Sequence, residues 1–91
     1  MLTVYSKNNC PFCVMTKHYL ETKNINFREI NIEQDIEARE FIQQQGLRTV
    51  PQIFMDGKIF VEGGWTGLSN MTAEDIVTEI DLRHSLADQT L

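Results

Sequence analysis

The pattern of apolar and polar residues predicts a short strand near the start of the chain, followed by a helix. Residues 2–6, Leu-Thr-Val-Tyr-Ser, are rich in side chains that favour strands. From residue 11 to about residue 23, Met15, Tyr19 and Leu20 recur at helical spacing. We therefore interpret the first quarter of the chain as strand, turn and helix.

A second strand and a second helix follow. Apolar and polar residues alternate from Phe27 to Ile32, which is typical of a strand with one buried face. Ala38, Phe41 and Ile42 then restore a helical period, which Gly46 ends. The first helix gives a crossover of about 12 residues between the two strands, which is long enough for them to be parallel.

The rest of the chain predicts a hairpin and a third helix. Two apolar runs, residues 52–55 and 58–61, are separated by Asp56-Gly57, a pair that favours a type I′ turn. Thr72 and Asp75 form a helix-capping box, followed by apolar residues at helical spacing. The predicted order is β-α-β-α-β-β-α, an α/β domain with a four-stranded mixed sheet flanked by three helices.

The length of the chain predicts one domain. Its 91 residues, 42% of them hydrophobic, can build one core but not two independent ones. The sequence shows no repeat, linker or low-complexity tract. We expect a single domain over residues 1–91, in which about residues 84–91 form a loosely ordered tail.

The net negative charge of the chain argues against nucleic acid as a partner. The chain has 13 acidic and 8 basic side chains and a net charge of −5, whereas nucleic-acid binding depends on Lys and Arg neutralising phosphates. No apolar run approaches the roughly 20 residues of a membrane helix, and the N-terminus does not have the pattern of a signal peptide. We predict a cytoplasmic monomer that binds neither nucleic acid nor a membrane.

Two cysteines carry the candidate chemistry. Cys10 and Cys13 are three residues apart, so a disulfide between them would close a loop too small to stabilise the fold much. In a reducing compartment such pairs are catalytic or metal-binding. At a strand-to-helix junction, the Cys10 sulfur would lie near free backbone N–H groups, which favour the thiolate. We predict that Cys10 attacks disulfides and that the more buried Cys13 resolves the mixed disulfide.

Neighbouring residues support this interpretation over two alternatives. Pro11 suits the first turn of a helix, and Lys7 adds a cation before Cys10. A zinc site needs four ligands, and the other candidates are His18 and His84, of which His18 points away from Cys13 on a shared helix. Two merely structural cysteines are the other alternative. We predict no metal site.

Three motifs in register resemble those of the dithiol glutaredoxins. They are Cys10-Pro-Phe-Cys13, Thr49-Val50-Pro51 and Gly63-Gly64, and the likeness extends over roughly residues 2–82. The resemblance implies a thioredoxin-like fold, a cis Val50–Pro51 bond, and reduction of disulfides and glutathione mixed disulfides. It implies glutathione as electron source and co-substrate, with no tightly bound cofactor. Disulfide-containing proteins, with ribonucleotide reductase as a candidate, would be the protein partners.

The resemblance also implies a glutathione groove. A cis proline facing the cysteines would leave the backbone of Val50 free to pair with an extended peptide. Lys7 would meet the glycine end of glutathione, and the turn at Gly64-Trp65-Thr66 would meet the γ-glutamyl end. The implied binding residues are Lys7, Phe12, Thr49, Val50, Pro51, Gly64, Trp65 and Thr66. For Thr49 an ordinary strand residue, and for Trp65 a cover over the core edge, remain equal alternatives; Arg39 is interpreted as a solvated side chain.

One departure from the family pattern keeps other functions open. Thr66 stands where many glutaredoxins have an Asp that contacts the γ-glutamyl group. An NrdH-type redoxin, reduced by thioredoxin reductase, is the first alternative, although its usual Phe-Arg-Pro-like stretch is absent. An iron–sulfur cluster-binding glutaredoxin is the second, although such proteins typically have a single active-site cysteine followed by Gly-Phe-Ser.

Overall fold

A four-stranded sheet lies at the centre of the computed structural model, which describes residues 1–88. Its strands are β1 (Leu2–Ser6), β2 (Phe27–Asn31), β3 (Gln52–Met55) and β4 (Lys58–Val61), arranged in the order β2-β1-β3-β4. β1 is parallel to β2 and antiparallel to β3, and β3 is antiparallel to β4. The predicted mixed sheet is confirmed.

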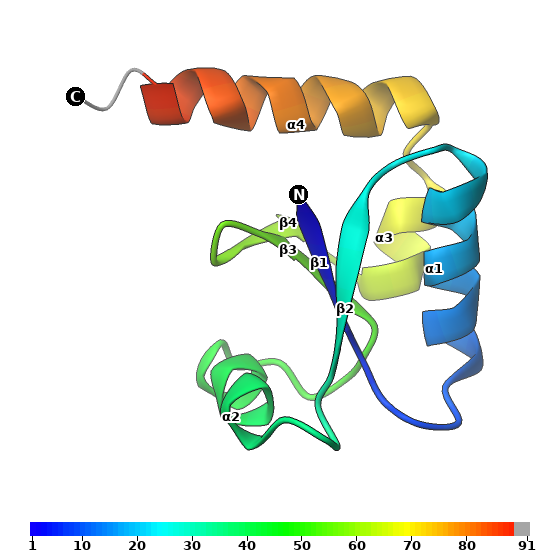
Figure 1. The fold of residues 1–91 in the computed structure, drawn as a ribbon, viewed down its shortest axis with the longest axis vertical. Helices are drawn as coiled ribbons and strands as arrows, with labels where there is room; N and C mark the ends of the chain where they lie inside the picture. Colours follow the sequence, from blue (N-terminus) through cyan, green and yellow to red (C-terminus); the bar gives the residue numbers. More distant parts are fainter. Residues whose placement is uncertain (89–91) are drawn as a thin grey trace.

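Within residues 1–88, four helices surround this sheet. They are α1 (Pro11–Thr22), α2 (Ile36–Gln44), α3 (Gly64–Ser69) and α4 (Ala73–Asp88). In Figure 1, α1 and α3 lie together on one side of the sheet, α2 lies on the other side, and α4 runs across the top of the view. None of the helices in residues 1–88 has the length and apolar composition needed to cross a membrane.

Alternation along the strands sorts side chains into two layers. Leu2 and Val4 point into the main core, which also takes side chains from β3, β4 and the helices α1, α3 and α4: Leu20, Ile53, Met55, Phe60, Leu68 and Ile76. On the opposite face, Tyr5, Phe41 and Phe54 form an aromatic cluster with ring centroids 5.2–5.7 Å apart. Each fully buried aliphatic side chain contributes about 1.5–3 kcal/mol, so burial in the main core stabilises the sheet.

The prediction of three helices is wrong, because the structure has a fourth, the short helix α3. The residues interpreted as a turn, Gly64-Trp65-Thr66, begin α3. The chain does turn there, because Gly63 and Gly64 have φ angles of +87° and +56°, which glycine adopts without strain. The helix then begins with no capping hydrogen bond from a side chain. The helix therefore has no start signal that a sequence pattern could reveal.

The predicted tail begins too early. α4 starts as expected, with Thr72 and Asp75 each donating a backbone N–H to the other's side chain, at 3.0 and 3.1 Å. It then continues to Asp88, and residues 89–91 of the predicted tail lie outside the described residues. Arg83 holds this part of the helix by donating to the backbone carbonyls of Ile59 and Phe60 in β4. No Gly or Pro interrupts the helix before Asp88, and its Leu, Arg and Ala residues favour it.

Candidate active site

Cys10 lies at the junction between the loop after β1 and the first turn of α1. It is the N-cap residue of α1, and Pro11 occupies the first helical position. The backbone N–H of Cys13 donates a hydrogen bond to Cys10 Sγ at 3.2 Å. The N-terminus of a helix carries unpaired N–H groups and a partial positive charge, so this position stabilises negative charge on the sulfur. The strand-to-helix placement agrees with the sequence prediction.

The two cysteines are joined by a disulfide, so the structure represents the oxidised state. Their Cα atoms are 5.2 Å apart. Cys10 is 8% exposed and Cys13 only 2%. The greater exposure of Cys10 favours it as the sulfur that an incoming disulfide reaches first, with Cys13 behind it.

A groove of about 310 Å³ adjoins Cys10 through Val50, whose carbonyl oxygen is 3.9 Å from Cys10 Sγ. The Val50–Pro51 bond is cis, as the resemblance implies. Seven of the eight residues implied to bind glutathione line this groove: Phe12, Thr49, Val50, Pro51, Gly64, Trp65 and Thr66. The structure thus brings together side chains from α1, α3 and the loop before β3. Their neutral character makes backbone groups the main polar partners that the groove offers.

Gln52 is a groove residue that the sequence analysis missed. It is 5% exposed, and its Nε2 donates to the carbonyl of Thr49 at 3.0 Å. Its Oε1 is buried and accepts no hydrogen bond from the described residues. The bond to Thr49 holds the loop that carries Thr49 and Val50. The available signal was its place directly after Pro51, at the start of a strand.

Lys7 lies outside that groove, in a neighbouring cavity of about 490 Å³. Thr49 and Val50 line both spaces, so the cavity and the groove share a wall. Arg39 of α2 and Arg48 of the loop before β3 also line the cavity. Arg39 is exposed, as predicted for a solvated side chain, and it also faces this cavity; Arg48 was not predicted, although it directly precedes the Thr49-Val50-Pro51 motif. With Lys7 they give this cavity three cationic side chains against the single carboxylate of Glu33, so its lining is cationic in balance.

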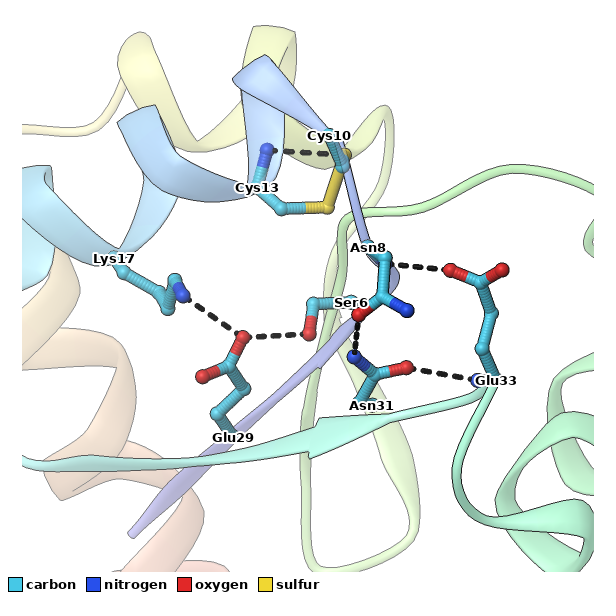
Figure 2. Close-up of polar contacts among 8 residues, drawn as sticks. All are labelled: Ser6, Asn8, Cys10, Cys13, Lys17, Glu29, Asn31 and Glu33. Atoms are coloured by element: carbon cyan, nitrogen blue, oxygen red, sulfur yellow. Dashed lines mark hydrogen bonds and ion pairs between the residues drawn. A yellow bond between two sulfur atoms is a disulfide. The ribbon is translucent and has the colours of Figure 1, made fainter.

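A third space, of about 620 Å³, touches both cysteines and contains a bonded carboxylate. Figure 2 shows Glu29 of β2 beside Ser6 and Lys17, below the disulfide. Ser6 Oγ donates to Glu29 Oε2 at 2.6 Å, and Lys17 Nζ lies 2.9 Å from the same oxygen. The hydrogen bond from Ser6, followed by that from Lys17, holds the pKa of the Glu29 carboxyl below its usual value. Glu29 is therefore a stable anion at neutral pH.

A second set of polar contacts fixes the loop that leads to Cys10. The backbone N–H of Asn8 donates to Glu33 Oε1 at 2.6 Å, and Asn31 Nδ2 donates to Asn8 Oδ1 at 2.9 Å (Figure 2). Asn31 Oδ1 in turn accepts from the backbone N–H of Glu33 at 2.9 Å. These bonds attach the loop after β1 to the chain that follows β2.

Comparison with known proteins agrees with this geometry. The family model described as glutaredoxin matches residues 2–61. The chain is 45% identical over 60 residues to the glutaredoxin-like protein NrdH of Lactococcus lactis subsp. cremoris, covering 66% of this chain and 83% of that protein. It is 39% identical over 56 residues to glutaredoxin 3 of Escherichia coli, covering 60% of this chain and 68% of that protein.

The fold is also similar to that of solved structures. One is the crystal structure of a buckwheat glutaredoxin–glutathione complex, with a TM-score of 0.68 and 25% identity. The match covers 86% of this chain and 74% of the buckwheat chain. Because the match covers 86% of this chain, it extends beyond the residues 2–61 that the family model matches.

Proposed function

This chain belongs to the glutaredoxin family of thiol–disulfide oxidoreductases, and we propose that it reduces protein disulfides and glutathione mixed disulfides with glutathione as its electron source. The observation that carries the proposal is the shared wall between the neutral groove beside Cys10 and the cationic cavity of Lys7, Arg39 and Arg48. Glutathione is a short peptide with a central cysteine and a carboxylate at each end. Lying along this wall, it would bring its sulfur to Cys10.

The two ends of glutathione would meet different chemistry. The glycine carboxylate would lie in the cavity of Lys7, Arg39 and Arg48, where charge-assisted hydrogen bonds are available. The γ-glutamyl end would lie at Gly64-Trp65-Thr66. Between them, the backbone of Val50 would pair with the cysteine residue of the ligand as an added strand. The crystallised complex of the buckwheat relative with glutathione supports glutathione as the ligand.

The proposed reaction uses one or both cysteines. With a glutathione mixed disulfide, the Cys10 thiolate attacks the glutathione sulfur, and the electron pair of the broken S–S bond leaves on the substrate sulfur, which takes up a proton. A second glutathione then attacks the Cys10–glutathione disulfide and leaves as oxidised glutathione. With a protein disulfide, Cys13 attacks Cys10 in the mixed disulfide and forms the Cys10–Cys13 bond. Two glutathione molecules then reduce that bond.

In this proposal glutathione is a diffusible co-substrate, and no cofactor is bound tightly. The protein partners are substrates that contain disulfides, and ribonucleotide reductase is a candidate from the resemblance alone. We also propose a cytoplasmic location, because a dithiol donor needs a compartment that keeps thiols reduced, and we expect a monomer. A visible chromophore of an iron–sulfur cluster in the freshly purified protein would contradict the absence of a bound cofactor.

Sequence identity to relatives favours one alternative to the glutaredoxin function. The chain is more similar to NrdH of Lactococcus lactis, at 45% identity, than to glutaredoxin 3 of Escherichia coli, at 39%. Thr66 is also neutral and exposed where the family often has a carboxylate. An NrdH-type redoxin reduced by thioredoxin reductase is therefore the alternative.

The electron donor separates the two functions. We expect NADPH consumption when the oxidised protein is combined with glutathione, glutathione reductase and a disulfide substrate. With NADPH and thioredoxin reductase in place of the glutathione system, we expect a much lower rate. The Cys10→Ser variant gives the background of both assays. A protein inert to glutathione but rapidly turned over by thioredoxin reductase would replace the glutaredoxin assignment with the NrdH-type one.

A further inference from the structure

Lys17 lies one helical turn after Cys13 on the same face of α1. Residues four apart on a helix are neighbours on its surface. Cys13 and Lys17 also line the same cavity, which is the space of about 620 Å³ that contains Glu29. The Lys17 ammonium group is therefore the cation of α1 that faces the space next to the resolving cysteine.

The position of that ammonium group is fixed by contacts on the sheet. Its Nζ is 2.9 Å from Glu29 Oε2, and the same oxygen accepts the hydroxyl of Ser6, which is fully buried. Ser6 and Glu29 belong to β1 and β2, which are hydrogen-bonded neighbours. Figure 2 shows the three side chains joined below the disulfide. Lys17 is thus tied to the rigid sheet while its own backbone lies on α1.

Few other charges face Cys13. The charged residues that line its cavity are Lys7, Lys17 and Glu29. The helix packed beside α1, α3, has the sequence Gly-Trp-Thr-Gly-Leu-Ser and carries no ionisable side chain. In the resolving step, Cys13 must become a thiolate although its side chain is almost completely buried. The charges of Lys17 and Glu29 should therefore strongly influence how readily Cys13 forms its thiolate.

We propose that Lys17 is a positioning residue for the resolving step, in which its ammonium group favours the Cys13 thiolate and Glu29 holds that group in place. The inference rests on the proposed dithiol reaction. In this step the S–H bond of Cys13 breaks and its proton passes to water in the cavity. A bond forms between the Cys13 and Cys10 sulfurs, and the bond from Cys10 to the substrate sulfur breaks. Its electron pair leaves on the substrate sulfur, which is reduced and then protonated.

The structure favours this electrostatic role over a role for Glu29 as the base that removes the proton. Two donors, Ser6 and Lys17, bind the same carboxylate oxygen and stabilise the ionised form of Glu29. A carboxylate stabilised in this way is a weak proton acceptor. Its negative charge would oppose a thiolate nearby, whereas the charge of Lys17 would favour it. The two residues should therefore influence Cys13 in opposite directions.

The probe for the test is 5,5′-dithiobis(2-nitrobenzoate), mixed with an equal amount of reduced protein. Attack by Cys10 releases the first coloured thiol, and attack by Cys13 on the resulting mixed disulfide releases the second, so two phases in a stopped-flow trace report the two cysteines. The Cys13→Ser variant, which lacks the second phase, assigns them. The rates are measured against pH for the wild type and for Lys17→Met, Lys17→Arg and Glu29→Gln. Lys58→Met, at an exposed lysine of β4, is the matched control.

We expect Lys17→Met to slow the second phase relative to the first about threefold to tenfold at neutral pH, and to raise its pH midpoint by about half a unit to one unit, as for a charge near a partly hydrated site. Lys17→Arg should restore the wild-type profile because the charge is kept. Glu29→Gln should lower the midpoint, because its amide oxygen can still accept a hydrogen bond from Lys17 while the negative charge is gone, and Lys58→Met should change neither phase. An unchanged second phase in Lys17→Met, or shifts in the same direction for Lys17→Met and Glu29→Gln, would overturn the inference. Because the probe needs no glutathione, loss of both phases in the wild type would instead refute the dithiol reaction itself.

Discussion

The groove on the Phe12 side of the disulfide and the cavity on the Lys17 side differ in chemistry. The groove is lined by neutral side chains and by the backbone around Val50 and Pro51. The cavity is lined by Lys7, Lys17 and Glu29, by Asn8 and Asn9 of the loop after β1, and by Asn31 at the end of β2. The cavity is lined by both cysteines and the groove adjoins Cys10, yet the groove offers shape and backbone groups whereas the cavity offers charge.

This difference suggests a division of work between the two sides. Backbone groups in a neutral groove can bind an extended peptide whatever its side chains, so the groove suits recognition. Fixed charges beside a buried thiol change how readily it loses a proton, so the cavity suits the chemistry of Cys13. Substitutions in the groove should then change substrate affinity, and substitutions in the cavity should change the rate of resolution.

The largest expected effect on activity comes from replacing the two cysteines, which lie between the groove and the cavity. Cys10→Ser should abolish all thiol–disulfide exchange, because no other thiol reaches the groove. Cys13→Ser should retain removal of glutathione from a mixed disulfide, which needs one thiol, and should lose most reduction of protein disulfides. Assays with a glutathionylated peptide and with a protein disulfide measure the two activities. Equal loss of deglutathionylation in both variants would contradict the assignment of Cys10 as the attacking residue.

The next effect tests the wall of the groove at Gly64. A Cβ atom at this position would lie 2.5 Å from the backbone oxygen of Pro51, and the φ of Gly64 is +56°. Gly64→Ala should therefore lower the free energy of unfolding by at least about 2 kcal/mol and raise the KM for a glutathione mixed disulfide, because the strained backbone must shift Pro51. Urea unfolding and steady-state kinetics measure both quantities.

Gly57 provides the matched control for that substitution. Its φ is +77°, but a Cβ there would meet no atom within 4 Å. Gly57→Ala should cost only the roughly 1 kcal/mol of the left-handed backbone and leave the KM unchanged. If the two alanine variants lost equal stability and bound substrate equally well, the close approach of α3 to Pro51 would not shape the groove.

Much of the fold follows from local signals. The hairpin of β3 and β4 was predicted with its bounds, because Asp56 and Gly57 supply the two positive φ angles that the turn needs. The buried face of α1 was predicted less well. Met15 is one of the apolar residues at helical spacing but is 43% exposed, whereas Thr16 is fully buried there. A threonine inside a core cannot be recognised from a pattern of apolar residues.

For the site as well, local motifs could be predicted from the sequence, whereas contacts between elements could not. The groove residues were implied by three motifs in register, because they follow the chain around Cys10, Pro51 and Gly64. The pairing of Lys17 with Glu29 was not predicted, because it depends on how α1 packs over the β1–β2 pair. Arg48 and Arg39 join Lys7 only after α2 and the loop before β3 are in place. Contacts between elements, unlike motifs within one element, require the tertiary structure.

A smaller effect is expected from substitutions of Thr66, which test whether the groove determines the affinity for glutathione. The contacts of Thr66 with Ser69 and Asn70 are made by its backbone carbonyl, so its exposed side chain can be replaced without breaking them. Thr66→Asp should lower the KM for glutathione by up to about tenfold, because a hydrogen bond to a charged group is worth about 1.5–3 kcal/mol against about 1 for a neutral bond. Thr66→Val, which lacks the hydroxyl, should raise it slightly. An unchanged KM in Thr66→Asp would mean that the ammonium group of the ligand lies elsewhere.

The smallest expected effect concerns stability on the charged side. The pKa of the Glu29 carboxyl is lowered in the folded state, first by the Ser6 hydrogen bond and then by Lys17. A lowered carboxyl pKa contributes stability that is present above the pKa of the unfolded chain and is lost as the pH falls through the folded pKa. The wild type should therefore lose more stability than Glu29→Gln between neutral pH and about pH 3, by at most about 1 kcal/mol for a partly exposed pair. Urea unfolding at both pH values measures the difference, and Ser6→Ala should reduce it because the main stabilising hydrogen bond is gone. If Glu29→Gln lost as much stability in acid as the wild type does, the Ser6 and Lys17 contacts would not stabilise the ionised carboxylate, and the contrast between a charged cavity and a neutral groove would lose its energetic basis.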